Sequence, residues 1–304
     1  MEKQTTIGIE VSVSGKGLHS GKFVTLTFKP APEGTGVSFR RIDLPGAPVV
    51  KACVDNVFDT SRGTSLKENG AEVRTVEHLM AALSGMGIDN VLIDINAGET
   101  PILDGSAKLY VNALREAGRT EQNAEKKYIE LSDTIRFTKP DNGIELMVEP
   151  AEKFSAHIEV DYNSQVLPAQ QAEIGDISDF AEQIAPCRTF VFLHEIQFLI
   201  ENNLVKGGDL DNAIVFVEQM PDAATIEKLS KFYNKTDIKV MENGVLNTLK
   251  LQFPNEPARH KLLDLIGDLY LLGAPVKGHV TAKKTGHFAN VEFARLIAEN
   301  AVSH

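Results

Sequence analysis

Cysteine is scarce in this chain: Cys53 and Cys187 are the only two among 304 residues. Two cysteines are too few for a disulfide framework or a four-cysteine zinc site. No stretch approaches the ~20 apolar residues of a transmembrane helix. The N-terminal residues alternate apolar with polar side chains, unlike the continuous apolar core of a signal peptide. We therefore expect a cytoplasmic protein with reduced thiols and no transmembrane segment.

Positive charge is also in deficit. Lysine and arginine number 31 and aspartate and glutamate 42, which gives a net charge of −11. Such a surface repels phosphate backbones and argues against a nucleic-acid partner. An anionic small molecule is compatible with this charge only where Lys, Arg or His side chains gather locally.

The length of the chain is sufficient for two domains. A polar segment without apolar periodicity, residues 118–127, indicates an interdomain linker. The predicted domains are an N-terminal α+β domain, 1–120, and a C-terminal α+β domain, 128–304.

Apolar periodicity predicts strands and helices in both halves. The predicted strands are 5–13, 23–29, 36–41, 90–95, 128–137, 143–149, 154–161, 212–217 and 277–283. The predicted helices are 75–85, 104–117, 178–184, 191–202, 222–232, 257–271 and one from 288. The polar stretch 163–176 is interpreted as a flap or a simple connection.

A short similarity between the halves hints at a duplication. Gly-Ile-Asp-Asn at 87–90 precedes the strand at 91–95, and Asp-Leu-Asp-Asn at 209–212 precedes 213–217. Asp-Asn is also a common turn before a strand, so chance explains the similarity as well.

The segment 259–268 is the most informative one. A helix here places His260, Asp264 and Asp268 four residues apart on one face. An imidazole and a carboxylate one turn apart can bind the same metal ion, as in catalytic zinc sites. A purely structural helix is the alternative.

A third ligand could come from the helix predicted at 75–85. His78, alone, would more often be a packed or surface histidine, but two histidines and a carboxylate leave a fourth zinc position open for water. Zinc lowers the pKa of bound water to roughly 7, and Glu77 could accept its proton. Otherwise Glu77 is a solvated surface acid.

Amide hydrolysis also needs a general acid and an oxyanion partner. His287 lies at a strand-to-helix turn, where Asp268 could raise its pKa. Thr189 and Lys261 could stabilise a developing oxyanion. Each has a plainer alternative: a helix-capping histidine, a strand threonine and a surface lysine. The apolar residues from Phe190 onwards could form core or line a groove for an acyl chain.

Several separated motifs, in order, resemble the zinc-dependent UDP-3-O-acyl-N-acetylglucosamine deacetylases of lipid A synthesis. The resemblance covers nearly the whole chain. The motifs that carry it are residues 14–21 (Ser-Gly-Lys-Gly-Leu-His-Ser-Gly), 75–79 (Thr-Val-Glu-His-Leu), 87–90, 101–106 (Pro-Ile-Leu-Asp-Gly-Ser), 188–190 (Arg-Thr-Phe), 207–213, 260–268 and 286–287 (Gly-His).

The resemblance implies a fold of two similar α+β domains, each a helical layer packed on a β-sheet, with the active site between them. It implies one zinc ion, bound by His78, His260 and Asp264.

The resemblance also implies roles for the other polar residues. Glu77 would be the general base, and His287 the general acid, supported by Asp268. Thr189 and Lys261 would stabilise the tetrahedral intermediate.

The substrate of this family is a UDP-acylglucosamine. The resemblance places His19, Phe190 and Lys261 along its path, and the segment from Phe192 to Ile196 beside the acyl passage. Tyr162 matches an aromatic position that can stack on the uracil.

The implied activity is hydrolysis of the N-acetyl group with release of acetate, an early committed step of lipid A synthesis. In some bacteria a similar domain is fused to a hydroxyacyl-carrier-protein dehydratase, so a fusion beyond residue 304 is an expectation. Two alternatives stay open: a zinc amidohydrolase acting on a different N-acyl substrate, and a non-catalytic nucleotide- or lipid-binding relative.

Overall fold

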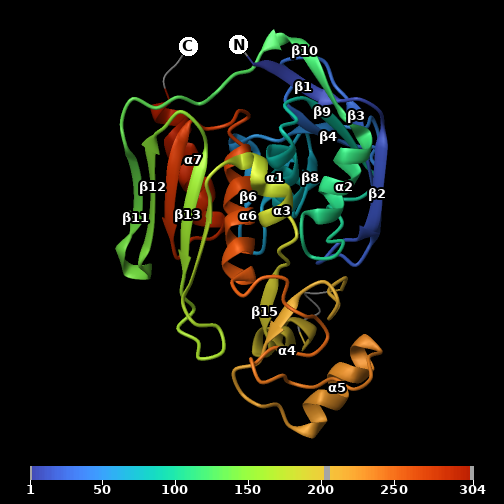
Figure 1. The fold of residues 1–304 in the computed structure, drawn as a ribbon. Helices are drawn as coiled ribbons and strands as arrows, with labels where there is room; N and C mark the ends of the chain where they lie inside the picture. Colours follow the sequence, from blue (N-terminus) through green and yellow to red (C-terminus); the bar gives the residue numbers. More distant parts are fainter. Residues whose placement is uncertain (1, 202–205, 302–304) are drawn as a thin grey trace.

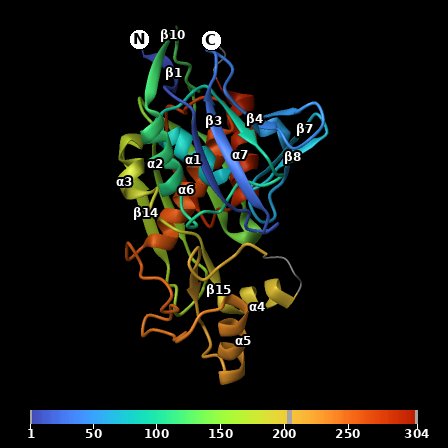
Figure 2. The ribbon, with the colours of Figure 1, turned by 90° about the vertical axis from the view of Figure 1, so that its right-hand side faces the viewer.

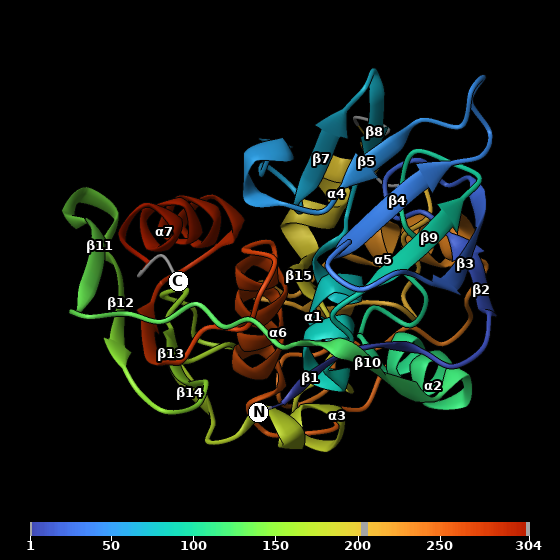
Figure 3. The same ribbon diagram turned by 90° about the horizontal axis from the view of Figure 1, so that it is seen from above.

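The computed structural model describes residues 2–201 and 206–301. Two five-stranded sheets form its outer layers, and two long helices, α1 (Glu77–Met86) and α6 (Glu256–Tyr270), lie side by side between them (Figures 1 and 3). Helix α2 (Lys108–Ala117) packs against the first sheet and α7 (His287–Asn300) against the second. The expected α+β class is confirmed.

The two large sheets share one topology. Their orders are β2-β3-β9-β4-β5 and β11-β12-β17-β13-β14. In each, the central strand is antiparallel to one neighbour and parallel to the other: β9 to β3 and β4, β17 to β12 and β13. The bounds are Val11–Lys16 (β2), Phe23–Pro30 (β3), Val37–Arg41 (β4), Val49–Lys51 (β5), Val91–Ile95 (β9), Ile135–Lys139 (β11), Ile144–Pro150 (β12), Ser155–Val160 (β13), Gln170–Ile174 (β14) and Gly278–Lys283 (β17).

This topology reveals the repeat that the sequence only hinted at, with a different pairing of segments. The central strand β9 of the first sheet corresponds to the central strand β17 of the second. The sequence similarity had instead paired residues 91–95, which are β9, with residues 213–217. Strand β16 (Ile214–Phe216) belongs to a separate two-stranded sheet, parallel to β15 (Phe190–Phe192). The Asp-Asn similarity is therefore local.

The strands follow from the alternation of side chains. Val24, Leu26 and Phe28 of β3 are fully buried, and the residues between them are not. Ala156, Ile158 and Val160 repeat this pattern in β13. One face of each sheet thus covers the helical layer and the other faces solvent.

Several strands have too little apolar alternation to be recognised in sequence. The stretch predicted as a flap or connection contains β14, and a three-stranded sheet consists of β6 (Val57–Asp59), β7 (Ser65–Glu68) and β8 (Ala71–Val73). The strand predicted at 128–137 is shorter, because β11 begins only at Ile135.

Most of the segment predicted as a linker, 118–127, is a strand. Arg119–Glu125 form β10, antiparallel to β1 (Lys3–Ile7). Because most side chains of β10 are exposed, its sequence carries no apolar period. The division into domains 1–120 and 128–304 stays a prediction.

A smaller lobe extends from the lower end of the molecule (Figures 1 and 2). It contains β15, α4 (Leu193–Glu201), β16 and α5 (Ala223–Tyr233), and the short α3 (Phe180–Gln183) precedes it in the chain. The helix predicted at 191–202 starts later, at Leu193, and its last predicted residue lies outside the described residues. Within the described part of the chain, no helix combines the length and apolar character that crossing a membrane requires.

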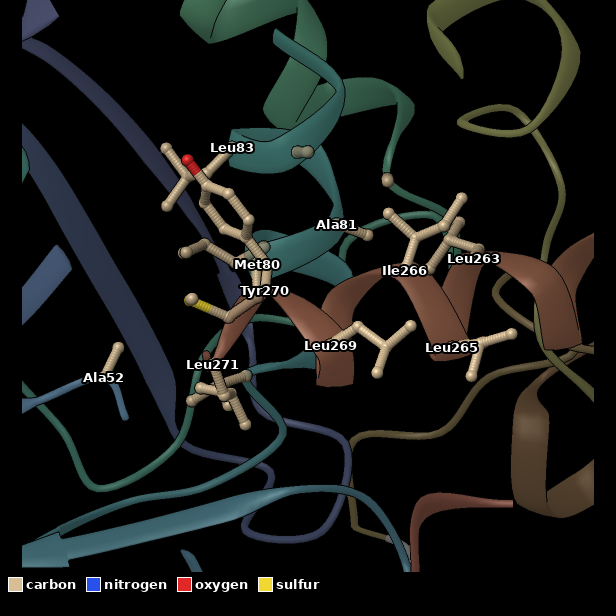
Figure 4. Close-up of a cluster of buried hydrophobic side chains, with 14 of the residues drawn as sticks. Ala52, Met80, Ala81, Leu83, Leu263, Leu265, Ile266, Leu269, Tyr270 and Leu271 are labelled. Atoms are coloured by element: carbon tan, nitrogen blue, oxygen red, sulfur yellow. The ribbon is translucent and has the colours of Figure 1, made fainter. Parts of the chain in front are cut away.

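Helices α1 and α6 hold the centre of the core together. Met80, Ala81 and Leu83 of α1 meet the side of α6 that carries Ile266 and Tyr270 (Figure 4). Helix α1 ends at Gly87, which adopts the left-handed conformation (φ 65°) of a helix C-cap. The polar residues of these two helices are thereby fixed relative to one another.

Candidate active site

Three side chains from the two central helices meet at one point. His78 is on the first turn of α1, and His260 and Asp264 are one turn apart on α6. Asp264 Oδ1 lies 3.4 Å from His260 Nε2 and 3.8 Å from His78 Nε2. One ligand atom from each of the three residues lies within 4.8 Å of the others. This spacing suits a single metal ion.

The surroundings of these residues prepare them for a metal. The main-chain oxygen of Cys187 lies 3.0 Å from His260 Nδ1, which leaves Nε2 directed at the cluster. Lys261 Nζ donates to Asp264 Oδ2 at 2.8 Å. Asp264 Oδ1 is buried, and no described residue supplies it with a hydrogen bond. A buried carboxylate oxygen beside two imidazole nitrogens is what a divalent cation would satisfy, so the residues fit a metal site.

The electrostatics agree with this fit. Burial and the neighbouring His260 lower the pKa of His78 to about 3. Burial works against ionisation of Asp264, but Lys261 and the surrounding histidines outweigh it and lower the pKa of Asp264 below its usual range. Neutral imidazole and ionised carboxylate are the forms that bind metal.

Glu77 lies directly beside the cluster and is 4% exposed. Its Oε2 accepts a hydrogen bond from the main-chain N–H of Thr64 at 2.9 Å. Its Oε1 lies 3.9 Å from His287 Nε2. Burial raises the pKa of Glu77 to about 7, helped by the nearby carboxylates of Asp268 and Asp264 and opposed by His287. The solvated surface acid considered from the sequence is excluded by this burial.

His287 is the first residue of α7, and Asp268 of α6 holds it. His287 Nδ1 lies 3.0 Å from Asp268 Oδ2, which also accepts from Asn290 Nδ2 at 2.8 Å. Burial lowers the pKa of His287, but Asp268 and then Asp264 more than compensate and raise it to about 9. A carboxyl group with a pKa near 7 therefore faces an imidazole whose raised pKa favours the protonated form at neutral pH.

Lys261 and Phe190 border the cluster on the α6 side. The ring of Phe190 lies edge-on to His260 with centroids 6.5 Å apart, and Lys261 Nζ is 5.7 Å from the Phe190 ring centre. Thr189 precedes Phe190 and donates its main-chain N–H to Gly105 at 2.8 Å.

A cavity of about 530 Å³ opens between the small lobe and the first domain. Of the predicted substrate residues, His19, Phe190 and Ile196 line it, together with Thr189. Phe192 is placed differently: it packs in a neighbouring apolar cluster with Phe216. Tyr162, 37% exposed, contacts the rings of Phe190 and Phe192 at 5.4 and 6.0 Å between centroids.

Sequence reasoning missed two polar residues of the site. Thr64 contacts the Glu77 and Asp268 carboxylates, and Asn290 contacts Asp268. Thr64 lies in a loop without periodicity, so no local signal marked it. Asn290 stands three residues after His287 on the predicted final helix, and this spacing could have suggested it.

Two imidazoles and a carboxylate within reach of one metal ion, with the buried Glu77 and His287 beside them, are an arrangement typical of metal-dependent hydrolases, here on an α+β fold. Comparison with known proteins agrees. The family model "UDP-3-O-acyl N-acetylglycosamine deacetylase" (LpxC) matches residues 4–234 and 229–299. The chain belongs to this family, as its motifs suggested.

Individual proteins of this family are similar to the chain over nearly its whole length. The chain is 45% identical over all its residues to the "Bifunctional enzyme LpxC/FabZ" of Bacteroides thetaiotaomicron, of which it covers 66%. It is 40% identical, over 97% of its length, to the "UDP-3-O-acyl-N-acetylglucosamine deacetylase" of Myxococcus xanthus, of which it covers 86%. The chain thus spans just under two thirds of the bifunctional relative.

Proposed function

We propose that this chain hydrolyses the N-acetyl group of UDP-3-O-acyl-N-acetylglucosamine and releases acetate, in the cytoplasm, as a step of lipid A synthesis. The observation that carries the proposal is the meeting of His78, His260 and Asp264 beside Glu77 and His287. Family membership supplies the substrate class, and the relatives named as deacetylases support it.

The resident metal of the proposed enzyme is zinc. His78, His260 and Asp264 would hold it, since two histidines and one carboxylate are a ligand set of catalytic zinc. When bound, zinc acts as a Lewis acid on the acetamide carbonyl and makes water more acidic.

Glu77 is the proposed general base. Its Oε2 is tied to Thr64, so Oε1 is the oxygen that faces His287 across the site. Oε1 takes a proton from the attacking water, whose oxygen forms the new bond to the acetyl carbon. This step requires the ionised form of Glu77, which predominates above its pKa of about 7.

His287 is the proposed general acid. Asp268 accepts the Nδ1–H of its ring, and Nε2 faces Glu77. As the carbon–nitrogen bond breaks, Nε2 gives its proton to the departing sugar nitrogen, which leaves as an amine while the acetyl group leaves as acetate. The raised pKa keeps this proton in place at neutral pH.

Thr189 and Lys261 are proposed to stabilise the negative charge on the carbonyl oxygen. The contact of Lys261 with Asp264 places its ammonium group at the edge of the cluster, and Thr189 lines the adjoining cavity. A hydrogen-bond donor or cation fixed in advance where charge develops is an effective form of catalysis.

The remaining contacts concern substrate binding. His19, Phe190 and Ile196 line the cavity that we propose receives the acyl chain. We propose that Tyr162, beside Phe190, contacts the nucleotide. Phe192 contacts the Tyr162 ring and packs in the same apolar cluster as Phe190, and we propose that it holds these two rings in position. We also propose that this chain belongs to a longer protein, in which it is fused to a hydroxyacyl-carrier-protein dehydratase.

The function is tested by measuring acetate release from UDP-3-O-acyl-N-acetylglucosamine and from the same acylated sugar without UDP. We expect rapid release only from the UDP-linked compound. Equal rates for both would favour an amidohydrolase with another substrate. Tight binding of the UDP compound without acetate release by the metal-loaded protein would favour the non-catalytic relative.

A further inference from the structure

Thr64 joins the two halves of the acid–base pair. It lies between β6 and β7 in the first domain and is fully buried. Its main-chain N–H donates to Glu77 Oε2, and its hydroxyl donates to Asp268 Oδ1. One residue thus contacts the base on α1 and the carboxylate that orients the acid on α7.

The main chain of Thr64 is fixed to the helix that carries the base. Its carbonyl oxygen accepts a hydrogen bond from the main-chain N–H of Val76 at 3.1 Å. Its own N–H donates to the side-chain Oε2 of Glu77, the residue that follows Val76. These two bonds attach Thr64 to the start of α1. The Thr64 hydroxyl is therefore held in place with respect to Glu77 and reaches from there to the second domain.

The hydroxyl of Thr64 donates to one particular oxygen of Asp268 and also lies 3.4 Å from His287 Nδ1. Oδ2 accepts from His287 and Asn290, while Oδ1 accepts from Thr64. Asp268 is fully buried, so water cannot replace a lost donor without rearrangement. Without the Thr64 hydroxyl, Oδ1 would lose this donor, and the carboxylate would be held through Oδ2 alone, so that its orientation and that of the His287 ring would be less strictly fixed.

We propose that Thr64 is a positioning residue that sets the general acid His287 against the general base Glu77 across the domain boundary. The proposal rests on the proposed deacetylase function. Thr64 itself exchanges no proton with the substrate. Its hydroxyl holds Asp268, Asp268 holds the His287 ring, and its N–H selects the Glu77 oxygen that faces the reaction.

The test uses two substitutions that leave the Thr64 main chain in place. Thr64→Val has nearly the same shape and lacks the hydroxyl, and Thr64→Ser keeps the hydroxyl and lacks the methyl group. Because loss of a group that orients a reacting side chain typically costs about tenfold to a hundredfold in activity, we expect Thr64→Val to lower kcat by that factor with KM nearly unchanged. Thr64→Ser should keep its kcat within about threefold of the wild type.

Thr6→Val is the matched control. Thr6 is a buried threonine whose hydroxyl donates to the Asn90 main-chain oxygen at 2.7 Å, outside the site. Its loss should lower thermal stability and leave kcat unchanged. Metal content is measured in every variant and should not differ.

A second measurement does not depend on turnover. The His287 Nδ1–H should give a ring NH signal in the NMR spectrum of nitrogen-15-labelled protein, assigned by its absence from His287→Gln. We expect this proton to exchange faster with water in Thr64→Val than in the wild type, Thr64→Ser or Thr6→Val.

An unchanged signal with unchanged kcat in Thr64→Val, beside an active wild type, overturns the proposal. An equal fall of kcat in Thr64→Ser and Thr64→Val also overturns it. A wild type that releases no acetate overturns the proposed function instead, and the NMR comparison still decides the contact.

Discussion

Gly267 of α6 lies directly against the main-chain oxygen of Glu77 on α1. A Cβ atom at position 267 would fall 2.1 Å from that oxygen and 3.1 Å from the main-chain nitrogen of Ala81. Main-chain atoms in a helix cannot move aside singly, so the two helices approach this closely only because residue 267 has no side chain. The distance between His78 on one helix and His260 and Asp264 on the other depends on this approach.

Gly267→Ala should therefore loosen the metal cluster and the core together. Forcing one methyl group between packed helices typically costs about 1–3 kcal/mol, and we expect a loss of this size in the free energy of unfolding, measured with urea. Metal affinity should fall as well, since the ligands on α1 and α6 separate. The control is Gly175→Ala, where a Cβ meets no atom within 4 Å. Unaltered stability and metal affinity in Gly267→Ala would contradict the structure.

The pH dependence of kcat should be bell-shaped between about 7 and about 9. Glu77 must be ionised, and because its pKa is raised to about 7, activity falls as the pH drops below that value. His287 must be protonated, and because its pKa is raised to about 9, activity falls as the pH rises above that value. Rate measurements from pH 5 to 10 in one constant-ionic-strength buffer series check this. The pH dependence of the residual activity of Glu77→Gln and of His287→Gln shows which limb each residue causes. Each variant should lose about 10²–10⁴ in kcat. An acidic limb that persists in Glu77→Gln would show that another group is the base.

Metal binding should depend on His78 specifically. We expect one metal ion per wild-type chain by elemental analysis, and loss of acetate release on chelation with recovery at low zinc. His78→Ala should hold far less metal. His157→Ala is the matched control, because His157 lies on the half-exposed outer face of the second large sheet, beside Glu159. Retention of the full metal content in His78→Ala would rule out the proposed ligand set.

The buried pair of Arg188 and Glu256 should stabilise the segment that carries Thr189. Glu256 is fully buried and accepts from Arg188 Nε at 2.9 Å and from the Arg188 main-chain N–H at 3.0 Å. Glu256→Ala leaves a buried guanidinium without its partner, which typically costs about 3–5 kcal/mol. Chemical denaturation measures this loss. Glu227→Ala removes a surface partner of Lys231 and should change stability little. If the two substitutions had equal effects, the Arg188 contact would not be a stabilising one.

Local sequence patterns predicted many elements of the fold and the spacing of His260 and Asp264, and the resemblance to the family implied the other residues of the candidate site. Strands β3 and β13 alternate fully buried with less buried residues, and α6 repeats its polar residues every four positions, so these elements could be recognised one by one. The separated motifs identified the family. Strand β14 and the β6–β8 sheet were not recognised, because these short strands contain too few apolar residues to show a clear period.

Thr64 illustrates what local patterns leave out. Its partner Asp268 is 204 residues away in the chain, and nothing in the surrounding loop distinguishes it from a surface threonine. The same holds for Phe192: the sequence indicates an apolar residue, and only the packing places it among Leu167, Phe216 and Val245 and not on the cavity wall.

The sequence by itself determined which side chains exist and how they are spaced along each helix, because a spacing of four residues defines one face of a helix wherever that helix lies. That was enough for the His260–Asp264 pair. The resemblance to the family suggested that His78 joins them, and the tertiary structure shows His78 beside Asp264, Glu77 facing His287, and Thr64 in contact with both Glu77 and Asp268. Burial and proximity set these pKa values and contacts, and both are properties of the packed chain that no local stretch contains.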